Sequence, residues 1–223
     1  VWVPAPSTSL VAVALMEAIA EAGLPAGVIN LVMGEGAVAG DAVVTHPGVV
    51  AIGFTGSAAT GKRIAERGVG KPMLLELGGN GPVVVFEDAD LDAAAAAAAG
   101  GAFFNAGQVC AATGRVLAHR SVVDPLCERL VEHAARHVLG DPFHQGTTMG
   151  PLNNAKVAAK VREHVEDAVA NGAKLLHGGK PRPDLGSALF FEPTVVRDVT
   201  PDMKINREAV SYTHLTLPTI LLV

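Results

Sequence analysis

Cys110 is the first residue whose type could do chemistry, because an ionised thiol is a strong nucleophile. It ends the stretch NAGQVC (residues 105–110), among small residues and directly after an Asn-Ala-Gly loop. A cysteine among alanine and glycine can be a small buried hydrophobic residue. A cysteine that follows such a loop can instead meet a ligand. The residues alone leave both interpretations open.

Glu76 is the second candidate, because a carboxylate can take a proton from water. It belongs to LELGGN (residues 75–80), where it lies inside an apolar strand and just before two glycines. A glutamate in such a strand forms an ion pair, reaches the surface, or serves a function. For an isolated glutamate, the structural interpretations are the commoner ones.

A third candidate is the stretch GFTGSAATGKR (residues 53–63), which has the glycine and lysine spacing of a phosphate-binding P-loop. A P-loop needs Ser or Thr after the lysine to hold magnesium, and Arg63 stands there instead. The stretch follows an apolar run and precedes a predicted helix. It is therefore either a helix N-terminus that binds phosphate or pyrophosphate, or an ordinary turn capped by Ser57.

The composition excludes several classes of protein. The net charge is −5 without a basic run, which argues against a nucleic-acid surface. Two cysteines, Cys110 and Cys127, are too few for a disulfide framework, so we expect a reducing, cytoplasmic compartment. His133 and His137 lack a zinc-site pattern, and we expect no metal. The apolar stretch at 93–104 is too short to cross a membrane.

The helices and strands that position these residues can be predicted from the periodicity of apolar residues. Helices are predicted over 9–23, 37–46, 57–67, 88–104, 121–140 and 153–172. Strands are predicted over 28–33, 49–54, 72–77, 82–86, 115–119, 173–178 and 193–196. This alternation predicts an α/β fold with a parallel sheet.

The three candidate stretches, in this order, resemble the aldehyde dehydrogenase superfamily over residues 3–210. Further stretches agree, among them EDADLDAA, MGPL, GAKLLHGG and FEPTVV. The resemblance implies part of a Rossmann-type NAD(P)-binding domain over 1–76, followed by part of an α/β catalytic domain over 77–210. It breaks at VSYTHLTLPTILLV, so residues 211–223 are interpreted as a foreign tail and left out of the fold. The alternative is a lineage-specific tail that packs on the body.

The same resemblance implies the site. Cys110 would be the nucleophile that forms a thiohemiacetal and then a thioester from an aldehyde, and Glu76 the base for hydrolysis. The presence of Glu76 favours hydrolysing members over relatives that acylate coenzyme A. The residues implied in binding NAD or NADP are Thr55, Gly56, Ser57, Thr60, Gly61 and Leu77. The parent enzyme is expected to be a homodimer or homotetramer that acts on a small-molecule aldehyde.

The chain also departs from the family pattern at cofactor positions. Val3-Pro4 stands where the family has Lys-Pro, whose lysine binds the adenosine ribose, and Pro6 stands where many NAD-preferring members have an acid. Ala209 stands where an acid would hold the nicotinamide ribose. These departures leave open the choice between NAD and NADP. They also leave open a catalytically inert fragment that binds nucleotide weakly at most.

Overall fold

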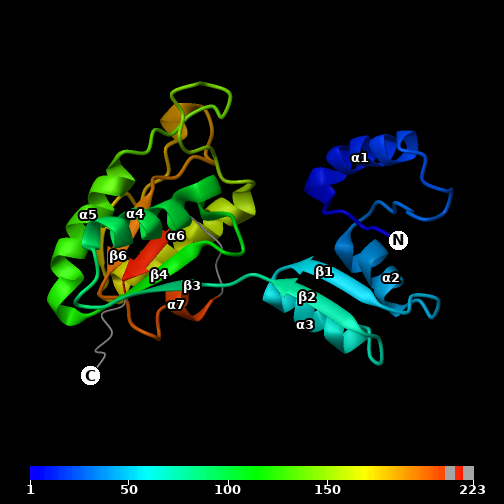
Figure 1. Ribbon diagram of the computed structural model, residues 1–223, viewed down its shortest axis with the longest axis horizontal. Coiled ribbons are helices and arrows are strands. Elements are labelled where there is room, and N and C mark those ends of the chain that lie inside the picture. Colours follow the sequence, from blue (N-terminus) through cyan, green and yellow to red (C-terminus); the bar gives the residue numbers. More distant parts are fainter. Residues whose placement is uncertain (209–213, 218–223) are drawn as a thin grey trace. The chain divides into compact units, whose positions relative to one another are not determined.

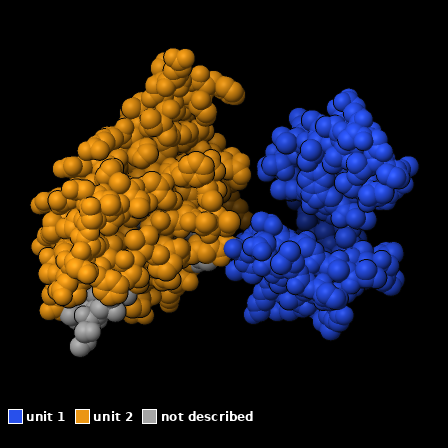
Figure 2. All heavy atoms as spheres, in the orientation of Figure 1, with its two compact units in different colours: residues 1–77 blue, residues 78–223 orange. Residues whose placement is uncertain are grey.

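The computed structural model describes residues 1–208 and 214–217, which form two compact units (Figures 1 and 2). Unit 1 comprises residues 1–77 and unit 2 residues 78–223. The sequence predicted a domain boundary one residue earlier, after residue 76.

Unit 1 is built around two parallel strands. Its elements are η1 (Pro6–Thr8), α1 (Ser9–Glu21), η2 (Gly36–Gly40), α2 (Asp41–Thr45), β1 (Ile52–Gly56), α3 (Ala58–Arg67) and β2 (Met73–Leu77). In the β1–β2 register, Thr55 lies opposite Glu76 and Gly56 opposite Leu77. The strand predicted over 28–33 is wrong, because that stretch forms only a single bridge, between Trp2 and Leu31.

Helix α3 packs against one face of these two strands. Gly61 of α3 lies so close to the Leu77 side chain that a Cβ at this position would approach within 2.5 Å. Side chains alternate between the faces of a strand. Leu77 and its alternate neighbours Leu75 and Met73 are accordingly half-buried, whereas Glu76 and Leu74 are exposed.

Unit 2 contains a five-stranded sheet in the order β3-β4-β7-β6-β5. Its pairs are parallel except β5 with β6, which is antiparallel. The strands are β3 (Gly81–Val85), β4 (Thr113–Ala118), β5 (Lys174–His177), β6 (Thr194–Arg197) and β7 (His214–Leu217). The helices are α4 (Leu91–Phe103), η3 (Phe104–Gly107), η4 (Arg120–Val122), α5 (Val123–Ala135), α6 (Ala155–Ala170), η5 (Pro183–Leu185) and α7 (Lys204–Arg207).

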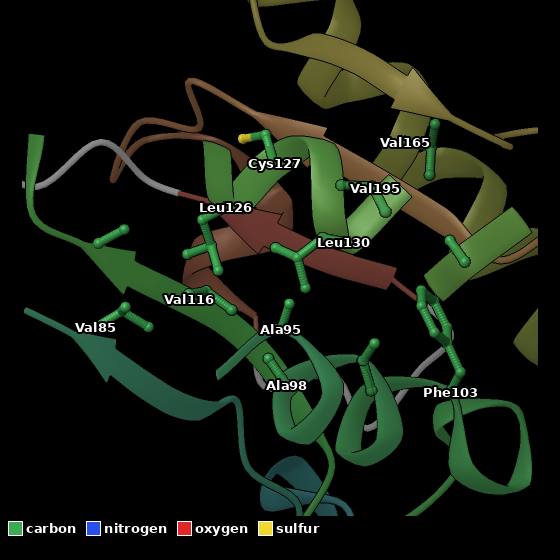
Figure 3. Close-up of a cluster of buried hydrophobic side chains, with 14 of the residues drawn as sticks. Val85, Ala95, Ala98, Phe103, Val116, Leu126, Cys127, Leu130, Val165 and Val195 are labelled. Carbon is green, nitrogen blue, oxygen red and sulfur yellow. The ribbon is translucent and has the colours of Figure 1, made fainter. Parts of the chain in front are cut away.

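The alanine run of the sequence forms α4, and its small side chains let this helix pack closely in the core. Asp90 caps the helix by accepting hydrogen bonds from the amides of Asp92 and Ala93 at 3.0 Å. Figure 3 shows Ala95 and Ala98 of α4 with Leu126 and Leu130 of α5 gathered beside Val116 of β4. These five residues are almost completely buried.

Strand β6 contributes to the core on both of its faces. Val195 belongs to the cluster built largely by α4, α5 and β4, whereas Val196 belongs to a second cluster with Ala168 of α6 and Ile205 of α7. Neighbouring strand residues point to opposite faces of a sheet. The sheet is therefore covered on both sides, as parallel sheets generally are.

Strand β7 was not expected from the sequence, which left residues 211–223 out of the fold. Residues 214–217 instead pair in parallel with β4 on one side and β6 on the other (Figure 1). This pairing fits the alternative of a tail that packs on the body. The other residues of the segment, 211–213 and 218–223, lie outside the described part of the chain.

Removing β7 should destabilise unit 2. A chain that ends after Glu208 leaves β4 and β6 without the strand between them, so we expect the thermal unfolding midpoint to fall by at least about 5 °C. In a chain of this size, 1 kcal/mol corresponds to roughly 2–4 °C. A chain that ends after Leu217 retains β7 and is the matched control. An unchanged or higher midpoint in the shorter chain is the result expected of a foreign appendage.

Candidate active site

Cys110 lies in a tight turn shortly after the end of α4. The amide of Ala112 donates to the carbonyl of Val109 at 3.0 Å, so Cys110 occupies the first central position of this turn. The residue is exposed. The interpretation of Cys110 as a buried hydrophobic residue is therefore wrong.

The backbone around Cys110 is held by a close approach to β3. A Cβ on Gly81 would come within 2.6 Å of the Ala112 carbonyl oxygen, and one on Gly79 would contact the Cys110 carbonyl oxygen at 3.4 Å. Glycine is required at position 81 because any side chain would push the two backbones apart. The turn that carries the thiol is thus seated against the strand that follows the LELGGN motif.

Cys127 provides a contrast within the same unit. It lies on α5 with 4% of its surface exposed, inside the main core cluster. Burial raises the pKa of the Cys127 thiol to about 11. This thiol therefore stays protonated and inert near neutral pH, because the thiolate is the nucleophilic form.

Glu76 lies on β2 in unit 1, with its residue exposed to solvent. The exposed position removes one of the structural interpretations, that of a buried, satisfied ion pair. Thr55 is its neighbour across the β1–β2 pair. Glu76 belongs to unit 1, whereas Cys110 belongs to unit 2.

The residues implied in cofactor binding come together within unit 1. Thr55 and Gly56 end β1, and Ser57 is the N-cap of α3. The Ser57 hydroxyl accepts a hydrogen bond from the Thr60 amide at 3.2 Å and lies 2.9 Å from the Thr60 hydroxyl. Ser57 thus caps α3, as the alternative of an ordinary capped turn predicted.

The N-terminus of α3 is suited to the pyrophosphate of a dinucleotide. The first four amides of a helix have no partner within the helix, and Ser57 satisfies only the Thr60 amide through its side chain. The remaining amides of the first turn and the helix dipole favour a phosphate or pyrophosphate at this end of α3. Leu77, opposite Gly56 and packed on Gly61, holds the helix against the strands.

The departures at the other cofactor positions involve nonpolar residues. Val3 and Pro4 precede η1, where neither side chain can donate a hydrogen bond to a ribose hydroxyl. Ala209 lies outside the described residues. The preceding acid, Glu208, pairs with Lys160 at 2.9 Å and lies 3.3 Å from His164. The hydrogen bond from Lys160 lowers the pKa of Glu208, so this carboxylate is charged and already engaged in unit 2.

The described residues hold no cluster of three or more His, Cys, Asp or Glu side chains arranged to bind a metal. The ring of His137 instead packs edge-on against Phe103, with centroids 5.2 Å apart. Among the residues that the structure describes, no helix has the length and apolarity needed to cross a membrane.

The chain belongs to the aldehyde dehydrogenase family, whose pattern matches residues 1–210. It is 44% identical to the mitochondrial succinate-semialdehyde dehydrogenase of Arabidopsis thaliana, over 93% of this chain and 39% of that protein. It is 42% identical to the betaine aldehyde dehydrogenase of Bacillus subtilis, over 97% of this chain and 45% of that protein.

Solved structures of related enzymes have the same fold as this chain. The betaine aldehyde dehydrogenase of Staphylococcus aureus in complex with NAD+ has a TM-score of 0.93 at 36% identity, over 98% of this chain and 44% of that one. An NADP-dependent enzyme of E. coli has a TM-score of 0.92 at 37% identity, over 98% of this chain and 45% of that one. The α/β, aldehyde dehydrogenase-like fold expected from the sequence is confirmed. The chain spans less than half the length of these relatives.

Proposed function

We propose that this chain carries the nucleophile and the general base of an enzyme that oxidises an aldehyde to a carboxylic acid with NAD(P)+. One observation carries the proposal. The cysteine of the NAGQVC motif is exposed in a turn seated against β3, whereas the other cysteine is buried and inert. A soft nucleophile that is also a good acyl leaving group suits this chemistry.

The reaction has two stages on Cys110. The thiolate adds to the carbonyl carbon and forms a thiohemiacetal, which loses the hydrogen on that carbon as a hydride and becomes a thioester. Glu76 then takes a proton from water, and the resulting hydroxide attacks the thioester carbon. The carbon–sulfur bond breaks, so the thiolate is restored and the acid leaves.

The cofactor, when bound, accepts the hydride. Thr55, Gly56, Ser57, Thr60, Gly61 and Leu77 would hold it, with the N-terminus of α3 facing its pyrophosphate. Its identity as NAD+ or NADP+ is left open, because relatives of both kinds have the fold and the ribose-binding lysine is replaced by Val3.

A catalytically inert polypeptide that binds nucleotide weakly is the second candidate. The absence of a ribose-binding side chain at Val3 favours it. A coenzyme A-acylating relative is the third candidate, and the presence of Glu76 disfavours it. For the active enzyme we propose a cytoplasmic homodimer or homotetramer that acts on a small aldehyde.

The test is aldehyde-dependent reduction of NAD+ and of NADP+ by a full-length enzyme that carries this chain. Succinate semialdehyde, betaine aldehyde and simple aliphatic aldehydes form the panel, followed at 340 nm. We expect acid and reduced cofactor in equal amounts, and the acyl group on the Cys110 peptide after rapid acid quenching. Nucleotide binding without reduction by any aldehyde would support the inert polypeptide instead.

A further inference from the structure

The side chain of Gln108 bridges the Cys110 loop and the loop before α6. Its Oε1 accepts a hydrogen bond from the Asn153 amide at 2.8 Å. Its Nε2 donates to the Asn105 carbonyl at 3.1 Å and lies 3.5 Å from the Pro151 carbonyl. Asn105 in turn donates from Nδ2 to the Gln108 carbonyl at 3.3 Å. The half-buried side-chain amide of Gln108 thus connects two loops, and Gln108 precedes Cys110 by two positions.

The backbone that Gln108 holds is strained. Asn105 and Ala106 have φ values of 52° and 53°, and Gly107 follows with φ 69°. These three residues form a left-handed turn, a conformation that is unfavourable for a residue with a Cβ such as Ala106. Such a conformation persists only where the surroundings enforce it, and it is found most often at functional sites. The side-chain bonds of Gln108 and Asn105 close this turn from both ends.

The other end of the bridge is fixed in the core. Leu152, next to Asn153, is almost completely buried, and its amide donates to the Leu189 carbonyl at 2.9 Å. Asn154 caps α6 by accepting from the Val157 amide at 3.0 Å. The loop that receives Gln108 is thus anchored on both sides, so it can restrain the Cys110 loop.

The chemistry of the bridge requires a primary amide. Gln108 accepts from a backbone N–H at one end and donates to backbone carbonyls at the other, and only an amide of this length does both. A carboxylate would keep the acceptor but set a second oxygen against the Asn105 and Pro151 carbonyls. A methionine would keep the shape and lose every hydrogen bond.

We propose that Gln108 is a positioning residue that fixes the orientation of the Cys110 thiol by holding the left-handed turn against the Asn153 loop. The proposal rests on the proposed function, in which Cys110 is the nucleophile. Attack on a carbonyl depends on the angle and distance of approach, and a displacement of about 1 Å can cost on the order of 100-fold in rate. Gln108 acts through the loop and does not itself react.

The experiment compares Gln108→Met with Gln145→Met in the full-length enzyme. Gln145 is the other glutamine of the chain and is exposed in a loop, so it is the matched control. We expect Gln108→Met to lower kcat about 10- to 100-fold with KM within about threefold of the wild type, and to slow NAD(P)H formation in the first turnover. Hydrogen exchange at the Asn153 amide should accelerate. The control should change none of these.

A second variant separates positioning from folding. Gln108→Glu keeps the acceptor for Asn153, so exchange there should stay slow while kcat still falls. Wild-type kcat in either variant overturns the inference, as does a rise in KM at constant kcat, which would make Gln108 a substrate-binding residue. If the wild-type enzyme reduces no cofactor, the proposed function fails. If the wild-type enzyme turns over and the Gln108 variants have the same kcat, the positioning role fails and the proposed function stands.

Discussion

An enzyme carrying Glu76→Gln should produce one burst of NAD(P)H and then stall. Hydride release needs only Cys110, substrate and cofactor, whereas the acid leaves only after water attacks the thioester. Glutamine has nearly the same shape as glutamate and cannot take a proton. We expect a burst of about one NAD(P)H per active site, followed by steady turnover lowered on the order of 10² to 10⁴-fold.

Mass spectrometry of the stalled enzyme should find the acyl group on the peptide that contains Cys110. Glu66→Gln, an exposed substitution on α3 of the same unit, is the control and should turn over normally. Recovery of turnover with added coenzyme A would identify an acyl-transferring relative. Full steady-state activity in the Glu76 variant would mean that this carboxylate is structural, and the hydrolytic stage would have to be withdrawn.

Cys110→Ala should abolish aldehyde oxidation. Without the thiol no thiohemiacetal forms, and neither the burst nor the steady phase should be detectable. The loss of activity exceeds that of the Glu76 variant, because the Cys110 substitution removes both thioester formation and thioester hydrolysis. The same substitution at Cys127 is the matched control, and it should leave turnover within about threefold because that side chain only fills the core.

The two thiols can also be compared without any turnover. Iodoacetamide should label one thiol per native chain, on Cys110, since Cys127 is buried and its pKa is raised to about 11. In Cys110→Ala, labelling should appear only after unfolding. Rapid labelling of the native Cys110 variant would show that Cys127 is accessible, and undiminished turnover in it would remove Cys110 from the mechanism.

Elements with a strong local signal were predicted well from the sequence. The helix that begins after Ser57 and the alanine-rich helix after Asp90 have capping side chains that fix their starts. The run at 28–33 has strand-forming residues but no continuous partner, because strand pairing depends on neighbours that local sequence does not specify. Strand β7 was missed for the same reason, since only its position between β4 and β6 makes it a strand.

The sequence predicted which residues belong to the candidate site but not their hydrogen bonds or backbone conformation. Motif order identified Cys110, Glu76 and the cofactor positions by resemblance, and their roles remain predictions. The bridge from Gln108 to Asn153 joins residues 45 positions apart, so no local pattern could reveal it. The left-handed turn before Gly107 was equally hidden, because alanine at position 106 gives no signal for a positive φ.

The contrast between the two cysteines has a consequence for oxidation by peroxide. A thiol that becomes a sulfenic acid can be recovered when a second thiol condenses with it to form a disulfide. Cys127, the other cysteine of this chain, is buried and protonated, so it cannot serve as that resolving thiol. Recovery of Cys110 within this chain would then depend on an external thiol such as glutathione, and without one the sulfur would proceed to irreversible sulfinic acid.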